Sequence, residues 1–531
     1  MPPFHPAATD GSRLAIGRPA LKWTFPVLFK IALYFAICLA ILTLLPARVW
    51  LHDGGVFLGL LGVFGAWRYS WWATHLMRAT IYARRTYPRL AADAAEVWTN
   101  GWRPRRLHFL VTTFRERAET TDAVVQAMCG EIRSVGQPPT IWLGSKEAPD
   151  EALFARCLER WGGDLDIHLK IVRQTGSGKR NAIALILAAM ARDGLGPQDF
   201  VAFMDSDFLI SPGAFATCLP LFATDPDLHA VTTDEDCIVD GPQWVRTWLE
   251  MRFAQRRIGM QSHALSGRVL TLTGRFSIFR ATHITSQAFI RLVEHDTLDH
   301  WLWGEFRFLS GDDKSTWYAL LRLGVRMLYV PDAHGVTIEV IDGSASHRMI
   351  ENLRRWSGNM LRNGTRAIAL GPRRMPLFIW WCLVDQRIAM WTMLLGPLCA
   401  VVGTVKLGPM FLLAYAVYVA MTRMVVAIVL FGYSHRVDLN YTWCLYANQL
   451  LNSIVKLYMI WRLPKQRWLN RGNQRSGAGS GGLLGAAREI MAGYLTGFSV
   501  LALLLFALLA TGTMSAPSLT LIETVYAGWP R

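Results

Sequence analysis

The sequence predicts an α/β domain with a mostly parallel, Rossmann-like sheet that is inserted between transmembrane α-helices. Two observations lead to this prediction. Apolar runs long enough to cross a bilayer lie near the N-terminus and in the last third of the chain, on either side of a long soluble stretch. Within that stretch, short β-rich runs alternate with helical patterns, which is typical of a parallel sheet with helices on both faces.

The composition fits a membrane protein better than a soluble one. Hydrophobic residues make up 52% of the 531 residues and charged residues 18%, whereas soluble domains carry about 25% charged residues. The net charge is +16, and the basic residues cluster beside apolar segments, as the positive-inside rule predicts. Because no zinc-finger or RNA-binding signature accompanies them, we expect no nucleic-acid partner. The eight cysteines form no CxxC pair, which indicates reduced structural thiols.

The apolar runs set the expected topology. Those of spanning length lie at 25–45, 56–77, 388–405, 410–431 and 483–509. Basic residues before the first run place the N-terminus in the cytosol, and two crossings return the chain there, so the soluble middle is expected to be cytosolic. The run at 441–461 carries several polar residues and is interpreted as an interfacial or re-entrant helix.

These segments predict six regions. They are an N-terminal tail with two transmembrane helices at 1–80, the cytosolic α/β domain at 81–345, interfacial amphipathic helices at 346–387, transmembrane and interfacial helices at 388–472, a flexible linker at 473–482, and a last transmembrane helix with its tail at 483–531.

Four strands open the α/β domain. They are predicted at 108–112, 140–143, 167–172 and 200–204, and helices between them at 119–135, 150–161 and 179–191. Ligands of such sheets bind beyond the carboxyl ends of the strands. We therefore expect the chemistry in the loops that follow these strands.

An acidic pair follows the fourth strand directly. Asp205 and Asp207 stand two residues apart, so both carboxylates can reach one divalent cation, Mg²⁺ or Mn²⁺. Such an ion can neutralise a diphosphate. Surface turns also use Asp freely, but the position at the end of a hydrophobic strand favours a metal site.

A second acidic pair, Asp312 and Asp313, lies between a glycine and a helical pattern at 315–322. Adjacent carboxylates repel each other, so one is expected to have a raised pKa that suits a general base. The alternative role is an N-cap for the following helix. Both roles are compatible, with Asp312 as the cap and Asp313 as the base.

Two basic motifs could bind phosphate. Lys179 and Arg180 open a helix after a glycine-rich stretch at 174–178, which resembles a phosphate cradle although GxxxxGK is absent. Arg355 and Trp356 lie on an amphipathic stretch, where the arginine can pair with a diphosphate and the tryptophan can stack on a sugar. A pair of interface residues is the alternative for the second motif.

Two loops carry weaker signals, and either could be an ordinary turn. Thr112, Thr113 and Glu116 end the first strand, where a nucleotide base would lie. Thr273, Gly274 and Arg275 precede a β-rich run and could face an acceptor. The residues His295, Asp296, His300 and Glu305 are too irregularly spaced for a zinc site.

In this order, the motifs resemble those of family-2 processive glycosyltransferases, which include cellulose, hyaluronan and alginate synthases. The resemblance runs from about 105 to about 468. Several stretches are most similar to the mannuronan-polymerising subunits of bacterial alginate synthases, namely 114–121, 232–235, 252–256, 269–275, 311–315, 329–333, 370–374 and 385–387. Two positions depart from the family pattern. Asn352 replaces the glutamine of Q-x-x-R-W, and Gly144-Ser145-Lys146 replaces an aspartate after the second strand.

The resemblance implies a GT-A-like fold and an inverting transfer that polymerises sugars from a nucleotide-sugar donor, with GDP-mannuronate preferred. It implies Asp313 and Asp312 as catalytic residues, Thr112, Thr113, Glu116, Lys179, Arg180, Asp205 and Arg355 as donor-binding residues, Thr273, Gly274, Arg275 and Trp356 as acceptor residues, and Asp205 and Asp207 as ligands of Mg²⁺ or Mn²⁺.

The resemblance also implies a location and partners. The chain would lie in the bacterial inner membrane, in contact with lipid and with the growing polysaccharide, which leaves through a channel between the membrane helices. A separate cyclic di-GMP-binding co-polymerase and periplasmic export proteins would assist it. Three alternatives remain open: another polysaccharide synthase of the cellulose, hyaluronan or curdlan type, a non-processive transferase to a lipid carrier, and a transporter with a soluble insertion.

Overall fold

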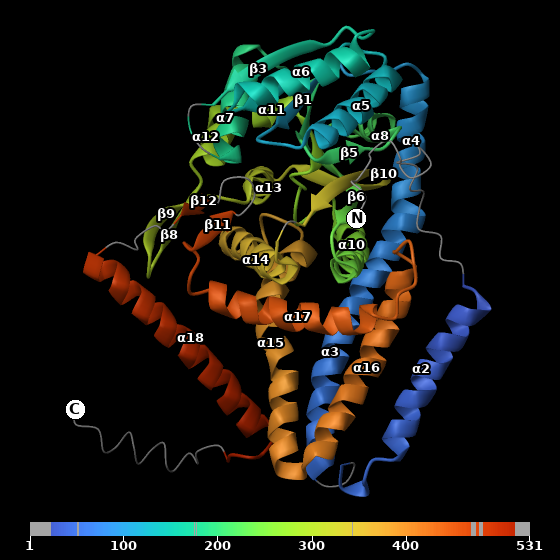
Figure 1. Ribbon diagram of the computed structural model, residues 1–531, viewed down its shortest axis with the longest axis vertical. Helices are drawn as coiled ribbons and strands as arrows, with labels where there is room; N and C mark the ends of the chain where they lie inside the picture. The colour runs from blue at the N-terminus through green and yellow to red at the C-terminus, as the bar shows by residue number, and fades with distance from the viewer. Residues whose placement is uncertain are drawn as a thin grey trace.

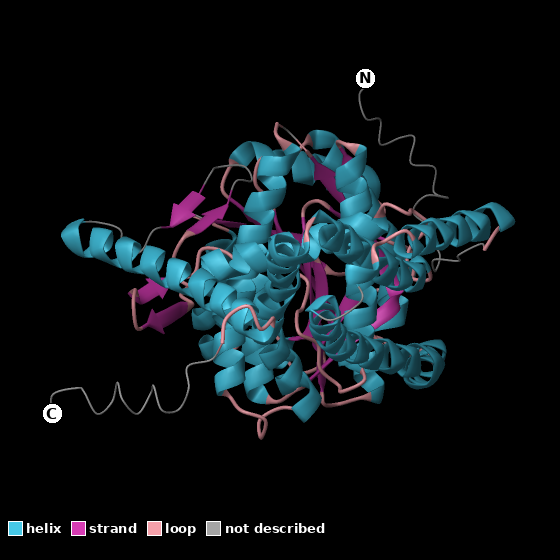
Figure 2. Cartoon of the chain, turned by 90° about the horizontal axis from the view of Figure 1, so that it is seen from below, coloured by secondary structure: helices cyan, strands magenta, loops and turns pink. Residues whose placement is uncertain are grey.

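The computed structural model describes residues 23–49, 53–174, 176, 178–341, 343–468, 474–476 and 482–515. An α/β domain occupies one end of the molecule, and long helices extend from it toward the other (Figure 1). Seen from below, these helices lie in front of the strands of the sheet (Figure 2). The basic residues of the N-terminal tail, which underlie the predicted topology, lie outside the described residues.

The α/β domain is built on an eight-stranded sheet with the order β3-β2-β1-β4-β7-β6-β10-β5. Its strands are β1 (Arg106–Thr112), β2 (Thr140–Ser145), β3 (His168–Arg173), β4 (Asp199–Asp205), β5 (Phe208–Ile210), β6 (Leu228–Asp240), β7 (Phe276–Arg280) and β10 (Arg326–Val340). The four predicted strands are all present and pair in parallel. The second half of the sheet is mixed, because β7 runs antiparallel to both of its neighbours and β5 antiparallel to β10.

Helices cover both faces of this sheet. The helices of the domain are α4 (Tyr87–Thr99), α5 (Ala118–Val135), α6 (Ala148–Gly162), α7 (Lys179–Arg192), α8 (Ala214–Cys218), α9 (Leu221–Thr224), α10 (Gln243–Ala264), α11 (Ala281–Ile284), α12 (Gln287–Glu294) and α13 (Asp312–Leu323). The inner residues of β1 and β4 are buried without alternation. Since successive side chains of a strand point to opposite faces, unbroken burial requires cover on both sides.

The remaining helices form the membrane region. They are α2 (Phe25–Thr43), η2 (Ala47–Val49), α3 (Asp53–Ile81) with its continuation η3 (Tyr82–Thr86), α14 (Ala345–Ala369), α15 (Leu377–Leu407), α16 (Pro409–Phe431), α17 (Tyr441–Met459) and α18 (Gly482–Ala510). Within the described part of the chain, four of them are long and apolar enough to cross a membrane, namely α2, α15, α16 and α18. The predicted span at 56–77 lies in α3, which falls outside this group because polar and charged residues such as Arg68 lower its hydropathy. It nevertheless packs against α15.

Two details of the membrane region differ from the expected boundaries. α15 begins at Leu377, so the membrane helix predicted from 388 already includes the end of the region described as interfacial. In the predicted linker, Gln474–Ser476 forms β12 and pairs with β11 (Gln466–Trp468). A polar, glycine-rich composition therefore did not prevent backbone pairing. Gly482 begins α18, and residues 473 and 477–481 of the linker lie outside the described residues.

α17 lies across the long axis of the molecule, between the α/β domain and the lower parts of α3, α15 and α16 (Figure 1). It contacts α14, α15 and α16. This crosswise position is what an interfacial helix would adopt, and the interfacial interpretation stays a prediction. The hairpin of β8 (Thr297–His300) and β9 (Gly304–Arg307) lies near β11 and β12, between the α/β domain and the membrane region (Figure 1).

Candidate active site

A cavity of about 230 Å³ lies at the carboxyl ends of the central strands. Its walls are formed by Thr112, Thr113, Phe114, Gly144, Lys146, Gln174, Gly178, Lys179, Ala182, Asp205, Ser206, Asp207, Arg275, Thr337, Glu339 and Arg355. The fold thus brings most of the predicted donor residues together, although they come from segments far apart in the sequence. We refer to this space as the donor cavity.

The end of β4 places the first acidic pair. Asp205 is the last residue of β4 and lies opposite Thr112 of β1 in the parallel register. Its backbone amide donates to the carbonyl of Arg275 at 3.0 Å. The carbonyl of Asp207 accepts from the amide of Ile338 at 3.0 Å, which joins this turn to β10. Backbone hydrogen bonds to Arg275 and to Ile338 of β10 therefore fix the main chain that carries both carboxylates.

Glu116 contacts the turn of the first acidic pair without lining the donor cavity. The Ser206 hydroxyl, between the two aspartates, donates to Oε2 of Glu116 at 3.2 Å. Glu116 is absent from the walls of the donor cavity. Its structural contact therefore positions the turn of Asp205 and Asp207, and direct donor binding by Glu116 stays a prediction.

Lys179 connects the two acidic pairs. It opens α7 after Gly178, whose φ of 92° only glycine adopts readily. Its Nζ lies 2.5 Å from Oδ1 of Asp205 and 3.2 Å from Oδ2 of Asp312. Burial alone would lower the pKa of Lys179, but the two carboxylates raise it above its ordinary value. The lysine is thus a fixed positive charge at the centre of the site. Thr175 and Ser177 of the predicted cradle lie outside the described residues.

The expectation that Arg180 contacts the donor is wrong. Its side chain is only 4% exposed. It donates to the carbonyls of Val293 and Ser310 and, at 2.7 Å, to the hydroxyl of Ser315. Successive residues of an α-helix point about 100° apart, and here Lys179 faces the donor cavity while Arg180 faces the interior. Arg180 holds the segment before α13 in place.

The second acidic pair opens α13, but Asp312 is not its N-cap, as one interpretation of the sequence expected. The cap is Gly311, with a φ of 85°. A Cβ at this position would lie 2.7 Å from the side chain of Asn359, so a residue without a side chain is needed there. Asp312 and Asp313 are therefore the first helical residues, and both side chains face a small cavity next to the donor cavity.

The two carboxylates differ in their pKa values. Burial would raise the pKa of Asp312, but the positive charges of Lys179 and Arg180 lower it below its ordinary value. Burial raises the pKa of Asp313, and the negative charge of Asp312 raises it further. Such a difference between the two pKa values is expected when one carboxylate stays ionised beside a cation and its neighbour acts as a base.

The loop of Thr273, Gly274 and Arg275 joins the two cavities. The antiparallel register of β7 begins at Met204 and Phe276, so this loop lies beside the end of β4. A Cβ on Gly274 would be 3.5 Å from both Asp313 and Lys179. Thr273 donates to Glu235 at 3.0 Å, and Arg275 lines the donor cavity. The loop is thus close to the proposed base, although acceptor binding remains a prediction.

Arg355 and Trp356 point to different sides of α14. Arg355 reaches the donor cavity and donates to Oδ1 of Asn352 at 3.3 Å, so the residue that departs from the family pattern orients this arginine. Trp356 stacks on Trp248 with ring centroids 6.1 Å apart, and the guanidinium of Arg252 lies 4.6 Å from its centroid. In the described residues Trp356 does not line the donor cavity, and its acceptor role stays a prediction.

Several wall residues were not predicted. Lys146 follows β2, and its charge could have indicated a phosphate contact. Phe114 and Ser206 lie inside predicted motifs without having been singled out. Thr337 and Glu339 belong to β10, and no local signal could have found them, since only pairing with β5 and β6 brings β10 to the cavity.

A second, larger cavity of about 570 Å³ lies among α3, α15, α16 and α17. Its walls include the aromatic side chains Tyr69, Trp71, Trp72, Tyr415 and Tyr418 and the charged side chains Arg68, Asp385, Arg423 and Lys456. We refer to it as the membrane cavity. Aromatic faces beside hydrogen-bonding and mainly cationic groups suit a hydroxylated, negatively charged chain.

The fold and the two acidic pairs define a glycosyltransferase. The model of the family described as "Glycosyltransferase like family 2" matches residues 104–359, which confirms both the predicted GT-A-like domain and the predicted enzyme class. The chain is 36% identical over 83% of its length to Glycosyltransferase alg8 of Pseudomonas syringae pv. tomato, covering 90% of that protein. It is 35% identical over 82% of its length to Glycosyltransferase alg8 of Azotobacter vinelandii, covering 88% of it. The chain belongs to the Alg8 family of glycosyltransferases.

The mannosyltransferase PcManGT from Pyrobaculum calidifontis, in complex with GDP-Man and Mn²⁺, is 18% identical with a TM-score of 0.41, over 74% of this chain and 98% of its own. The family membership removes the alternative of a transporter with a soluble insertion.

Proposed function

We propose that this enzyme polymerises mannuronate from GDP-mannuronate into mannuronan, with inversion at the transferred sugar and with Mg²⁺ or Mn²⁺ as cofactor. The observation that carries the proposal is the junction of the donor cavity with the small cavity of Asp313, across Lys179. A donor bound by its diphosphate in the first cavity would present its sugar to an acceptor hydroxyl beside Asp313.

The donor cavity is suited to an anionic nucleotide sugar. The cations Lys146, Lys179, Arg275 and Arg355 line it together with the carboxylates Asp205, Asp207 and Glu339. Lys179 and Arg355 would pair with the diphosphate. The nucleoside would bind at the end of β1, in contact with Thr112, Thr113 and Phe114.

The carboxylates of Asp205 and Asp207 fit a divalent cation. Both line the same cavity, and carboxylate oxygens are preferred ligands of Mg²⁺ and Mn²⁺. When bound, the ion would neutralise the charge that develops on the leaving diphosphate. Lys179 already contacts Asp205, so the lysine restrains this carboxylate and shares in the neutralisation.

Asp313 would act as the general base. The acceptor hydroxyl gives its proton to the Asp313 carboxylate while its oxygen forms a bond to the anomeric carbon. The bond from that carbon to the diphosphate breaks on the opposite face, and the configuration inverts. Asp312 stays ionised beside Lys179 and raises the basicity of its neighbour.

The membrane cavity supports processive transfer. We propose that the growing polysaccharide passes from the acceptor side through this cavity and across a bacterial inner membrane, with the catalytic domain in the cytoplasm. α3, α15, α16 and α17 line this cavity, and α15 and α16 are long and apolar enough to cross a membrane. A cyclic di-GMP-binding co-polymerase and periplasmic export proteins are proposed partners on the strength of the family resemblance.

The test is an assay of membranes from producing cells, with cyclic di-GMP, over a panel of labelled nucleotide sugars. We expect an insoluble or high-molecular-mass product from GDP-mannuronate alone, digestible by a mannuronan-specific lyase, and no product after addition of a chelator. A polymer from UDP-glucose or UDP-N-acetylglucosamine would instead identify another polysaccharide synthase. A product extracted with lipid would identify the non-processive alternative. Membranes with Asp205→Asn give the blank.

A further inference from the structure

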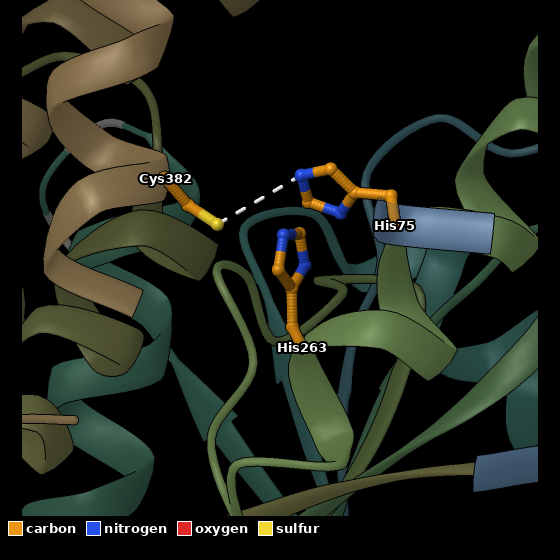
Figure 3. A group of neighbouring side chains, drawn as sticks. All are labelled: His75, His263 and Cys382. Atoms are coloured by element: carbon orange, nitrogen blue, oxygen red, sulfur yellow. Dashed lines mark hydrogen bonds between the residues drawn. The ribbon is translucent and has the colours of Figure 1, made fainter. Parts of the chain in front are cut away.

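Three side chains from separate helices meet where the catalytic domain joins the membrane region. His75 comes from α3, His263 from the end of α10 and Cys382 from α15. Figure 3 shows the two imidazole rings and the thiol turned toward one another. One ligand atom from each lies within 4.8 Å of the others. Nε2 of His75 lies 3.9 Å from Sγ of Cys382. The rings of His75 and His263 pack edge to face, with their centroids 5.5 Å apart.

This set of atoms has the chemistry of a transition-metal site. Two imidazole nitrogens and one thiolate favour zinc and similar ions over Mg²⁺ or Mn²⁺, which prefer oxygen. Around a tetrahedral zinc ion such atoms lie about 3.3–3.7 Å apart. The observed separations therefore require shifts of only about 1 Å, within the reach of side-chain rotation.

The surroundings of the histidines also indicate a ligand. Nδ1 of His75 lies 2.9 Å from the hydroxyl of Ser262, which fixes the ring and leaves Nε2 directed at Cys382. Such second contacts orient metal-binding histidines. Nδ1 of His263 is buried without a hydrogen-bond partner in the described part of the chain, and an unpaired buried group calls for an explanation.

The charged neighbour Arg78 is compatible with this site. Its guanidinium donates to the carbonyl of Ser262 at 3.3 Å and to the hydroxyl of Ser266 at 2.6 Å, and it stacks on Phe378 at 3.7 Å. These contacts hold it in place. His75 also lines the membrane cavity, from which a water molecule can supply a fourth ligand.

We propose that His75, His263 and Cys382 bind one zinc ion, which links α10 of the catalytic domain to α3 and α15 of the membrane region. The site is separate from that of Asp205 and Asp207 in both position and ligand type. Its role is structural: the ion would join α10 and α15 through α3, which packs against both, beside the membrane cavity.

The test measures zinc in the purified full-length chain. After treatment with a chelator, the protein is loaded with Zn²⁺ in excess Mg²⁺, freed of unbound ions and analysed for metal. We expect about one zinc ion per chain, and at least tenfold weaker binding in His263→Gln and in Cys382→Ser. Cys399→Ser, which removes another buried thiol of α15, and Asp207→Asn, which alters the donor site, should both retain the ion.

A second measurement uses the wild-type chain alone, so that misfolding of a variant cannot decide the outcome. Loading with Co²⁺ should produce the thiolate-to-cobalt charge-transfer absorption. The proposal is overturned if the wild-type chain retains no zinc and shows no such absorption. It is equally overturned if folded His263→Gln and Cys382→Ser bind zinc as the wild type does.

Discussion

The ammonium group of Lys179 lies 2.5 Å from a carboxylate oxygen of Asp205 and 3.2 Å from one of Asp312. One side chain therefore connects the residues proposed to hold the metal ion with the pair that contains the proposed base. We expect Lys179→Met to weaken donor binding by at least about tenfold, because charge-assisted hydrogen bonds are worth roughly 1.5–3 kcal/mol. Titration of the purified variant with GDP checks this, and Lys146→Met, at the rim of the same cavity, serves for comparison. Equal affinity in Lys179→Met and the wild type would contradict the prediction.

Asp205→Asn and Asp207→Asn should each abolish transfer while the protein still inserts into the membrane. Loss of one electrostatic group in an active site costs about 10²–10³ in rate, and both carboxylates stand where the diphosphate would leave. The rate is measured with the purified variants over a range of Mn²⁺ concentrations. Substantial activity in either variant with metal present would refute the assignment.

Asp313→Asn should lower the rate by about 10²–10⁴ and leave donor affinity unchanged, as expected for a general base. Since the pKa of Asp313 is raised, wild-type transfer should fall as the pH decreases through that raised pKa, at a higher pH than an ordinary aspartate would produce. A pH–rate profile together with nucleotide titration gives both quantities. If affinity and rate fall together, Asp313 has a binding or structural role instead.

Arg180→Met should destabilise the catalytic domain and not affect donor contacts directly. Its guanidinium is bonded to Val293, Ser310 and Ser315 in the interior, and removal of one partner from a buried charged network costs about 3–5 kcal/mol. Thermal unfolding measures the loss, and nucleotide titration of the folded fraction should give the wild-type affinity. A variant of normal stability with weakened nucleotide binding would restore Arg180 to the donor site.

The proposed topology places the hairpin of β8 and β9 in the cytoplasm and the turn between α15 and α16 in the periplasm. Trp301 is 73% exposed, and Lys406 in the last turn of α15 is exposed, so a cysteine at either position should be accessible. In intact spheroplasts, an impermeant maleimide should label Lys406→Cys but label Trp301→Cys only after lysis. The native chain, whose cysteines are buried or half-buried, is the blank. Labelling of Trp301→Cys before lysis would reverse the orientation.

The sequence by itself determined the first four strands, the helices between them and the position of both acidic pairs at element ends. These features depend on local patterns: a hydrophobic run sets a strand, and the residues directly after it must lie at the carboxyl edge of a parallel sheet. The class of enzyme followed from the order of the motifs, because the set is far more specific than any one of them.

Only the tertiary structure decided what each side chain faces. Lys179 and Arg180 are neighbours in sequence, yet the direction of α7 sends one into the donor cavity and the other into the interior. Gly311, rather than Asp312, caps α13 because Asn359 of α14 leaves no room for a Cβ. The antiparallel placement of β7 brings Gly274 to Asp313. His75, His263 and Cys382 meet although each lies more than a hundred residues from the next along the chain, since contacts between distant segments arise from packing and leave no local signal.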